Sequence, residues 1–397
     1  MFIPLASIHD ASAPRYPAWL ALGFRPFYLL AAAWMIVALP VWLVMFGHGA
    51  VMASHLQGVN WHAHEMVFGF TPAVITGFLF TAVKNWTGQP TPRGLPLLVI
   101  AGVWLLARVL LLTSLSKLGM IFDIAFFVLA AVGIAIPLLR SGNRRNVFFI
   151  GLLLLLGSLS ALHHYAALSS APVLRTDQVV QLALTIIAVI ITVITGRVIP
   201  MFTSNAVAGA PVKKLPHLEQ AAVVSVIAVG LVVALFSSSP VTPLVCIVAA
   251  AIHLWRWWLW APHWTLGKPI LWILHGSYLW LPISFLLRAS ASWQPMNALL
   301  ATHALTLGLI TGLCLGMMTR TARGHTGRAL QVGRAETTAY VLIVLAAVLR
   351  VLLPLLLPSH YRLWASLSGL LAIAAFAIYF AIYLPWLCQP RADGRPD

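Results

Sequence analysis

Continuous apolar stretches of about 20 residues dominate this sequence, and this is the length that an α-helix needs to cross the hydrocarbon core of a bilayer. Of the 397 residues, 61% are hydrophobic and only 8% are charged, whereas soluble domains carry roughly 25% charged residues. A water-soluble fold of this size has too little interior to bury so much apolar surface. The stretches do not alternate in polarity, so helices are favoured over a membrane β-barrel. The sequence therefore predicts an all-α, polytopic membrane helix bundle.

Gly, Pro and clustered charges divide the apolar sequence into twelve predicted spans within one integral membrane domain, residues 1–397. The spans lie near residues 27–46, 62–83, 95–113, 118–139, 147–168, 177–198, 219–236, 241–259, 269–289, 296–318, 336–357 and 362–386. With this count, 18 of the 24 Lys and Arg residues fall on the side of the two termini. The positive-inside rule then predicts that both termini are cytoplasmic. The net charge of +16 follows from this topology and does not require a nucleic-acid partner.

The second predicted span begins with polar residues that are costly in lipid and are therefore candidates for function. In a helix, His62 and His64 point about 200° apart, so they would serve two sites on opposite sides of that helix. His62 and Met66 share a face and offer an imidazole and a thioether to a soft metal such as copper. Glu65 is suited to orient a histidine or to accept a proton in catalysis. The alternative is that both histidines are hydrogen-bonded, inert residues at the membrane interface.

Further histidines are expected within the membrane. His163 and His164 lie near the outer end of the fifth predicted span, and His303 lies in the outer half of the tenth. His275 falls in the inner half of the ninth span. Neutral imidazole is the usual ligand for haem iron and copper, so these four side chains are predicted metal ligands together with His62 and His64.

Arg108 and Asp123 lie equally far from the tight loop that joins the third and fourth predicted spans. Antiparallel neighbouring helices would bring the two side chains to the same depth. We expect them to form an ion pair that holds these helices together, rather than a functional site.

The predicted inner face carries a second group of candidate residues, formed by Arg197, Arg320, His325 and Arg328. Arginines held at a membrane surface suit an anion such as a carboxylate, a haem propionate or a lipid phosphate. The alternative is that these charges only set the topology. Because Gly, Pro, Trp and His surround them in the sequence, binding of a cofactor anion is kept as a hypothesis.

Several of these motifs resemble the NnrS family, which comprises haem- and copper-containing bacterial membrane proteins of the nitric oxide response. The resemblance implies haem and copper as cofactors, location in the bacterial inner membrane, and histidine ligands among His62, His64, His275, His303 and His325, with His163 a weaker match. Met201 stands where the family pattern has phenylalanine. The matching motifs are Phe24-Arg25-Pro26-Phe27, Trp61-His62-Ala63-His64-Glu65-Met66, Asn85-Trp86-Thr87-Gly88, Asn143-Arg144-Arg145-Asn146, Gly196-Arg197-Val198-Ile199-Pro200-Met201-Phe202-Thr203, Leu274-His275-Gly276, His303-Ala304-Leu305, Met317-Met318-Thr319-Arg320 and Gly324-His325-Thr326-Gly327-Arg328.

Three functions fit these observations. The first is a redox protein that binds nitric oxide or a nitrosyl species at a histidine-ligated site and converts it, relieving nitrosative stress. The second is a transporter or carrier of copper, haem or a nitrosyl complex, for which twelve spans are typical. The third is a haem sensor or assembly factor without turnover. The sequence identifies no electron donor for the redox function.

Overall fold

The computed structural model describes residues 16–49, 51–237 and 239–395, and no β-strand occurs within these ranges. Eleven helical segments there are long and apolar enough to cross a membrane. The all-helical, multi-pass prediction is therefore confirmed. The elements are η1 (Ala18–Leu20), α1 (Phe24–His48), α2 (Gly58–His64), η2 (Glu65–Phe70), α3 (Thr71–Thr87), α4 (Leu95–Leu110), α5 (Ser116–Arg140), η3 (Arg144–Asn146), α6 (Phe148–Leu168), α7 (Thr176–Ala206), α8 (Pro216–Leu235), α9 (Val241–Leu259), η4 (Pro262–Thr265), α10 (Pro269–Ala289), η5 (Ser290–Ser292), α11 (Met296–His303), η6 (Ala304–Thr311), α12 (Gly312–His325), α13 (Arg334–Val351), α14 (Leu353–Leu356), η7 (Pro358–His360) and α15 (Tyr361–Cys388).

Each predicted span has a helical counterpart in the described residues, although the bounds differ. The third counterpart, α4, has only 16 residues. At about 1.5 Å per residue it is shorter than the roughly 30 Å hydrocarbon core. Helix α7 continues to Ala206 instead of ending near residue 198, so the loop that follows it begins later than predicted. Apolar composition located the helices, whereas their exact ends depend on packing.

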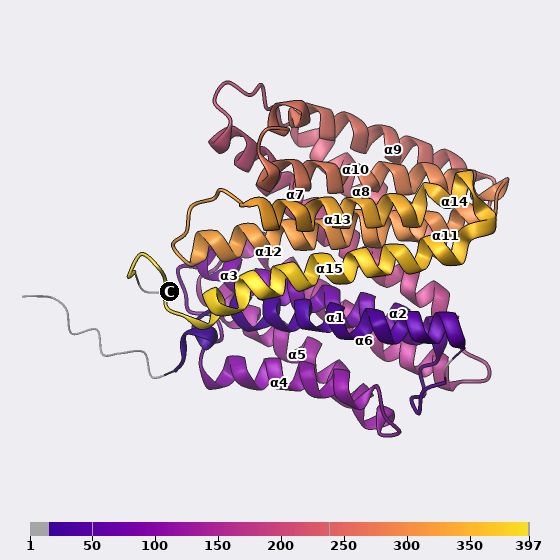
Figure 1. The fold of residues 1–397 in the computed structure, drawn as a ribbon, viewed down its shortest axis with the longest axis horizontal. Coiled ribbons are helices and arrows are strands. Elements are labelled where there is room, and N and C mark those ends of the chain that lie inside the picture. Colours follow the sequence, from indigo (N-terminus) through magenta and orange to yellow (C-terminus); the bar gives the residue numbers. More distant parts are fainter. Residues whose placement is uncertain (1–15, 50, 238, 396–397) are drawn as a thin grey trace, which may run out of the picture.

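The helices run alternately up and down the long axis of the molecule, and both described ends of the chain lie at the same end of the bundle (Figure 1). Near the start of α1, the Arg25 guanidinium donates hydrogen bonds to the carbonyl oxygens of Leu387 and Gln389, at 3.0 and 2.7 Å. We call this the terminal end and the opposite one the distal end. An even number of crossings produces this arrangement.

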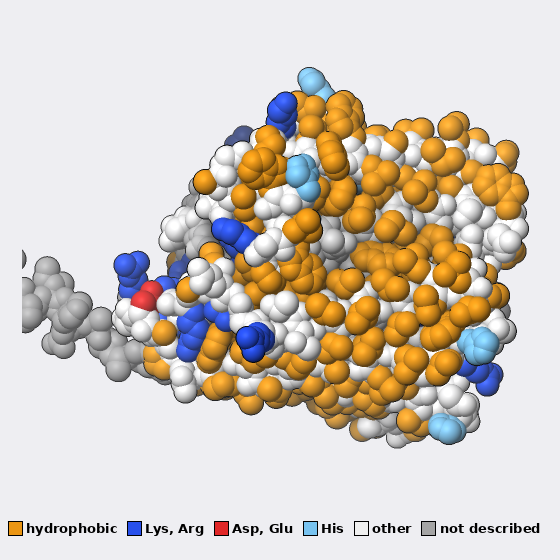
Figure 2. Space-filling model, turned by 45° about the horizontal axis from the view of Figure 1, so that its top comes forward, with side chains coloured by type: hydrophobic (Ala, Val, Ile, Leu, Met, Phe, Trp, Pro, Cys, Tyr) orange, Lys and Arg blue, Asp and Glu red, His pale blue; other side chains and the backbone are white. Residues whose placement is uncertain are grey.

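The helical segment Gly58–Thr87, formed by α2, η2 and α3, lies at the centre of the bundle. Of its most apolar window, 89% is buried inside the protein, compared with 33% for α9. The peripheral helices instead turn apolar side chains outward, and Figure 2 shows this apolar surface along the body of the molecule. Polar side chains on the central segment therefore face other helices rather than lipid.

Two of the spans contain π-helical turns. Segment η2 (Glu65–Phe70) follows His64 directly, and η6 (Ala304–Thr311) follows His303 directly. At the end of η2 the Thr71 hydroxyl donates to the carbonyl oxygen of Met66, and at the end of η6 the Thr311 hydroxyl donates to that of Thr306. Such wide turns are rare and are frequent at functional sites.

Candidate metal centre and central cavity

Three side chains from three helices converge in the distal half of the bundle. His64 comes from α2, Asp123 from α5 and His164 from α6, and one ligand atom of each lies within 4.8 Å of the others. The Oδ2 atom of Asp123 is 3.4 Å from Nε2 of His64 and 3.6 Å from Nε2 of His164. All three side chains have 0% exposure, so water does not solvate them. We call this group the His64 cluster.

The hydrogen bond between His64 and Glu65 fixes the orientation of the His64 ring. Nδ1 of His64 lies 3.1 Å from Oε1 of Glu65. A carboxylate only accepts hydrogen bonds, so Nδ1 carries the proton. In the neutral ring, Nε2 then directs a lone pair toward the Asp123 carboxylate, and it has no hydrogen-bond partner among the described residues. Two acceptors facing each other in a buried site need a shared proton or a bound metal cation between them.

The second histidine of the cluster is oriented from the loop before α2. Nδ1 of His164 lies 2.9 Å from Nε2 of His55. Burial, with smaller contributions from His164 and His64, lowers the pKa of His55 from 6.5 to about 4. His55 is therefore neutral at physiological pH and can accept the His164 proton, which leaves Nε2 of His164 free. His163 packs against the His64 ring, with 5.5 Å between ring centroids, and neither of its nitrogens has a partner in the described residues.

The charges around the cluster do not balance. Arg108 donates to Oε2 of Glu65 at 3.0 Å and also pairs with Asp123, which confirms the predicted Arg108–Asp123 ion pair. Ser160 donates to the same Asp123 carboxylate. Two buried carboxylates thus share one guanidinium, leaving one negative charge if the histidines are neutral. An uncompensated buried charge is strongly unfavourable, so the site favours a bound cation.

The π-helical segment η2 makes room for Arg108. A Cβ atom at Gly69 would lie 2.6 Å from Nη1 of Arg108 and 3.0 Å from Oε2 of Glu65. The Gly69 carbonyl accepts a hydrogen bond from Nε1 of Trp104, at 3.1 Å. Glycine at this position therefore allows the guanidinium to approach the central helix closely.

The opposite side of the same helix faces a cavity of about 320 Å³, the size of a small-molecule site. His62 and Met66 both line it, as their shared face predicted, and the His62 ring stacks on Trp42 with 4.4 Å between centroids. Nδ1 of His62 is buried and has no partner in the described parts of the chain. His303 lines the other side of the cavity. His62 and His64 thus belong to two separate sites, as the helical spacing predicted.

A comparison with known protein families matches nearly the whole chain. Residues 18–391 match the NnrS protein family, so the match includes the His64 cluster, the cavity and both π-helical turns. The chain belongs to the NnrS family. Among curated proteins, none matches the chain.

The remaining predicted site residues of this NnrS family member lie in the terminal half, away from both sites. Nε2 of His275 is 2.9 Å from the Thr203 hydroxyl. Among His, Cys, Asp and Glu of the described residues, the His64 cluster is the one group of three or more that could hold a metal. It does not include His275, so a metal role for His275 stays a prediction.

The four inner-face residues of this NnrS family member are mostly engaged with aromatic rings. Arg197 donates to Oδ1 of Asn146 at 2.7 Å, and Arg320 lies 3.6 Å from the centre of the Phe202 ring. Arg328 lies 4.3 Å from the Trp386 ring centre, and His325 packs on Phe24. These contacts account for the aromatic residues near the arginines, and anion binding by this group stays a prediction.

Sequence reasoning missed three residues of the two sites in this NnrS family member. Asp123 was interpreted only as the partner of Arg108, although it also faces two histidines. His55 lies in a loop and carries no motif signal. Arg350 lines the cavity and was not among the candidate residues. The available signal for Asp123 was its depth, since it lies seven residues after the distal start of α5, while His64 lies six residues after the distal start of α2.

Proposed function

We propose that this protein is a histidine-ligated redox metal protein that binds nitric oxide within the bacterial inner membrane and converts it. Copper would be held by His64, His164 and Asp123, and haem would occupy the central cavity at His62. Imidazole and carboxylate donors suit copper, and imidazole is a common axial ligand of haem iron. Such metals would supply a centre that binds nitric oxide and exchanges electrons.

One observation carries the copper part of this proposal. The free lone pairs of His64 and His164 and the Oδ2 atom of Asp123 converge in a buried site with excess negative charge. Without a metal, this arrangement requires a proton on one of the two imidazoles. The donor set, the burial and the charge all favour a divalent cation.

Glu65 was expected to act in catalysis or to orient a histidine, and its contacts support the orienting role. One of its oxygens faces His64 and the other accepts from Arg108. A carboxylate that fixes the tautomer of a ligating histidine raises the basicity of that ligand. Arg108 in turn holds Glu65 and Asp123 in place. Both residues therefore position the ligands and do not contact the cavity.

The cavity residues support the haem part of the proposal. The walls are mostly apolar, and His62 has an unpartnered ring nitrogen in the described structure. Met66 offers a thioether beside it. Nitric oxide is neutral and small, so it can reach such a site through lipid and needs no polar channel.

The test is metal analysis of the purified protein with matched variants. Iron and copper are quantified in wild type, His64→Gln, His164→Gln and Asp123→Asn, with His217→Ala on the exposed surface as the control. We expect copper to be lost in the three cluster variants and retained in the control. Glu65→Gln should lower the copper affinity about 10- to 100-fold. Consumption of nitric oxide with a chemical reductant then tests the redox role.

Wild-type protein that is folded, contains no copper after metal supplementation and has unchanged thermal stability with copper present would contradict the metal centre. In that case, a protonated histidine explains the geometry of the cluster. A preparation that never shows a haem absorption band would remove the haem part alone.

Transport of copper, haem or a nitrosyl complex is the alternative, and one observation favours it. The cavity is lined near the distal end by Val59 and Asp177, which are both exposed, so it opens at one end of the bundle. A one-sided cavity between helices is typical of transporters. Copper uptake into liposomes containing the protein would favour this alternative over redox chemistry.

A further inference from the structure

Arg350 of α13 reaches into the wall of the central cavity without a matching negative charge. Its Nη2 atom donates to Nε2 of His303, at 3.1 Å, and its guanidinium carbon lies 4.8 Å from the centre of the Tyr361 ring. Nη1 is buried and has no acceptor among the described residues, and no described carboxylate forms an ion pair with Arg350. Arg350 as a whole is partly buried, but a buried guanidinium nitrogen in this state is unfavourable unless a ligand supplies the acceptor.

The contacts of His303 show that it positions this guanidinium. Arginine only donates hydrogen bonds, so Nε2 of His303 must accept. Nδ1 of His303 therefore carries the proton and donates to the carbonyl oxygen of Leu299, at 3.0 Å. Both ring nitrogens are occupied, and His303 has no lone pair left for a metal while Arg350 stays in place. This argues against the predicted metal role of His303.

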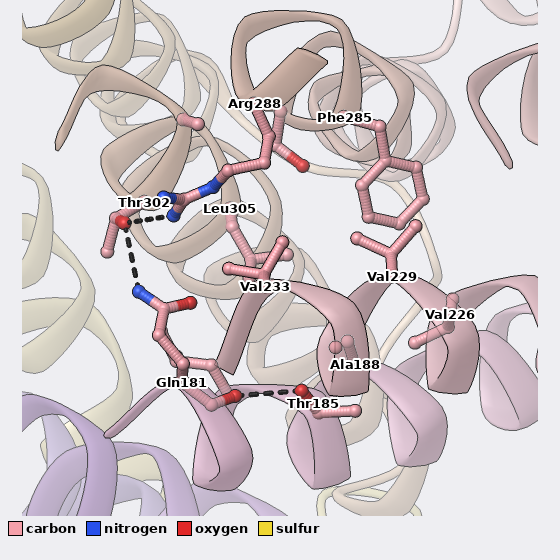
Figure 3. Close-up of a pocket in the computed structure, with 14 residues that line it drawn as sticks. Gln181, Thr185, Ala188, Val226, Val229, Val233, Phe285, Arg288, Thr302 and Leu305 are labelled. Atoms are coloured by element: carbon pink, nitrogen blue, oxygen red, sulfur yellow. Dashed lines mark hydrogen bonds between the residues drawn. The ribbon is translucent and has the colours of Figure 1, made fainter. Parts of the chain in front are cut away.

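A second arginine, Arg288, contacts α11, the helix that carries His303. Nη2 of Arg288 donates to the hydroxyl of Thr302, which Gln181 also contacts, at 2.9 and 3.3 Å (Figure 3). Thr302 and Gln181 line both the central cavity and the smaller pocket that contains Arg288. Arg288 likewise has no ion pair with a described carboxylate. The acid nearest the cavity mouth, Asp177, pairs with Arg175 instead.

Arg350 gives the cavity a positively charged side in a predominantly apolar space, and Arg288 lies in the adjoining smaller pocket. Met35, Leu39, Phe70, Leu184 and Ile310 line the apolar part. The complementary ligand has an apolar body and an anionic group with two oxygens that can meet the guanidinium.

We propose that Arg350, positioned by His303, binds the carboxylate of an amphipathic ligand or a free planar oxyanion in the central cavity. The proposal deepens the proposed function, because a porphyrin carries such carboxylates and nitrite is an oxyanion of the same size class as a carboxylate group. The carboxylate and the oxyanion share one chemistry. Each has two oxygens that can accept hydrogen bonds from two N–H groups of the Arg350 guanidinium, one of them on Nη1.

Metal-free protoporphyrin IX separates the anion contact from metal ligation, because it cannot bind a histidine through iron. Its binding is measured by fluorescence titration and compared with that of its dimethyl ester, which has no carboxylate. Nitrite is titrated separately by calorimetry. The variants are Arg350→Gln and Arg350→Lys, and the control is Arg362→Gln, an exposed arginine at the same end that does not line the cavity.

We expect wild type and Arg362→Gln to prefer the free acid over the ester, or to bind nitrite. Arg350→Gln should weaken the binding of that anion about 10- to 100-fold. Arg350→Lys keeps the charge but loses the fork of two donors, so it should recover only part of the affinity. A thermal unfolding curve shows that each variant is folded, and removal of the uncompensated charge should leave the midpoint unchanged or raise it.

The outcomes separate this proposal from the proposed function. A preference for the free acid that disappears in Arg350→Gln supports a ligand carboxylate, and nitrite binding that disappears supports a free oxyanion. If no porphyrin binds but nitrite binding depends on Arg350, the haem part of the proposed function fails and this inference stands. This inference is overturned if the free acid and the ester bind equally well and nitrite binding is either absent or independent of Arg350.

Discussion

Some buried polar side chains of this protein have a complete set of partners, and others do not. Arg256 has a complete set of partners, since it pairs with Glu219 through two hydrogen bonds and also contacts the Tyr278 hydroxyl and the Thr192 carbonyl. His64 and Arg350 each leave a buried atom without a partner in the described residues. An unsatisfied buried group costs about 1–3 kcal/mol. The complete network therefore stabilises the fold, whereas His64 and Arg350 lie at the two sites where we propose that ligands bind.

Two stacked tyrosines of α15 provide a test at the residue scale. The Tyr383 hydroxyl donates to Oε1 of Glu336 at 2.5 Å, whereas the Tyr379 hydroxyl is buried without a hydrogen bond to any described residue. We expect Tyr383→Phe to lower the free energy of unfolding by about 1–3 kcal/mol, because Glu336 loses a donor. Tyr379→Phe should be neutral or stabilising. Thermal unfolding in detergent measures both, and an equal loss in the two variants would show that Tyr379 has a bound partner such as water.

At the element scale, the two π-helical turns are the features that shape the sites. Each follows a histidine that faces a site, and each ends at a threonine whose hydroxyl satisfies the carbonyl oxygen five residues earlier. A π-helical turn widens the helix locally and frees carbonyl groups for other partners. In η2, Gly69 uses this freedom to accept from Trp104 and to admit the Arg108 guanidinium.

A Gly69→Ala substitution tests this role of η2. The added Cβ would lie 2.6 Å from Nη1 of Arg108, which two carboxylates hold in place. We expect a loss of about 1–3 kcal/mol of stability from overpacking, together with a lower copper content. Gly102→Ala in α4 is the matched control, because nothing lies within 4 Å of its added Cβ. The control should gain up to about 1 kcal/mol from helix propensity. Similar stability and copper content in both variants would contradict the close approach.

At the scale of the whole molecule, both described ends of the chain lie at one end of an even-numbered bundle. Lys and Arg are concentrated on this side in the predicted topology, so the positive-inside rule predicts that it faces the cytoplasm. The His64 cluster and the mouth of the central cavity would then lie toward the opposite face. This orientation is a prediction that native cysteines can test.

Cys388 is exposed at the terminal end of α15, whereas Cys246 and Cys314 are buried. A membrane-impermeant thiol reagent should therefore label Cys388 in inverted membrane vesicles but not in intact spheroplasts. Ser170→Cys in a Cys388→Ser background places the thiol in an exposed loop at the distal end and should reverse the pattern. Labelling of Cys388 from outside the spheroplasts would reject the cytoplasmic placement of the termini.

Local sequence determined the helices and several of their contacts. Apolar runs of sufficient length form helices in lipid because their backbone groups must be satisfied internally. Helical spacing placed His62 and His64 on opposite faces, and the tight loop between α4 and α5 brought Arg108 to Asp123. These are properties of one helix or of two consecutive helices, which the sequence alone specifies.

Only the tertiary structure decided which helices meet around the sites. Asp123 and His164 reach His64 because α5 and α6 pack beside the central segment, and Arg350 reaches His303 because α13 packs against α11. The hydrocarbon of the bilayer stabilises each apolar helix within the membrane. It does not select the neighbouring helices, since lipid is as apolar as the side chains it contacts. Side-chain packing and buried hydrogen bonds make that selection, and they involve residues far apart in the sequence.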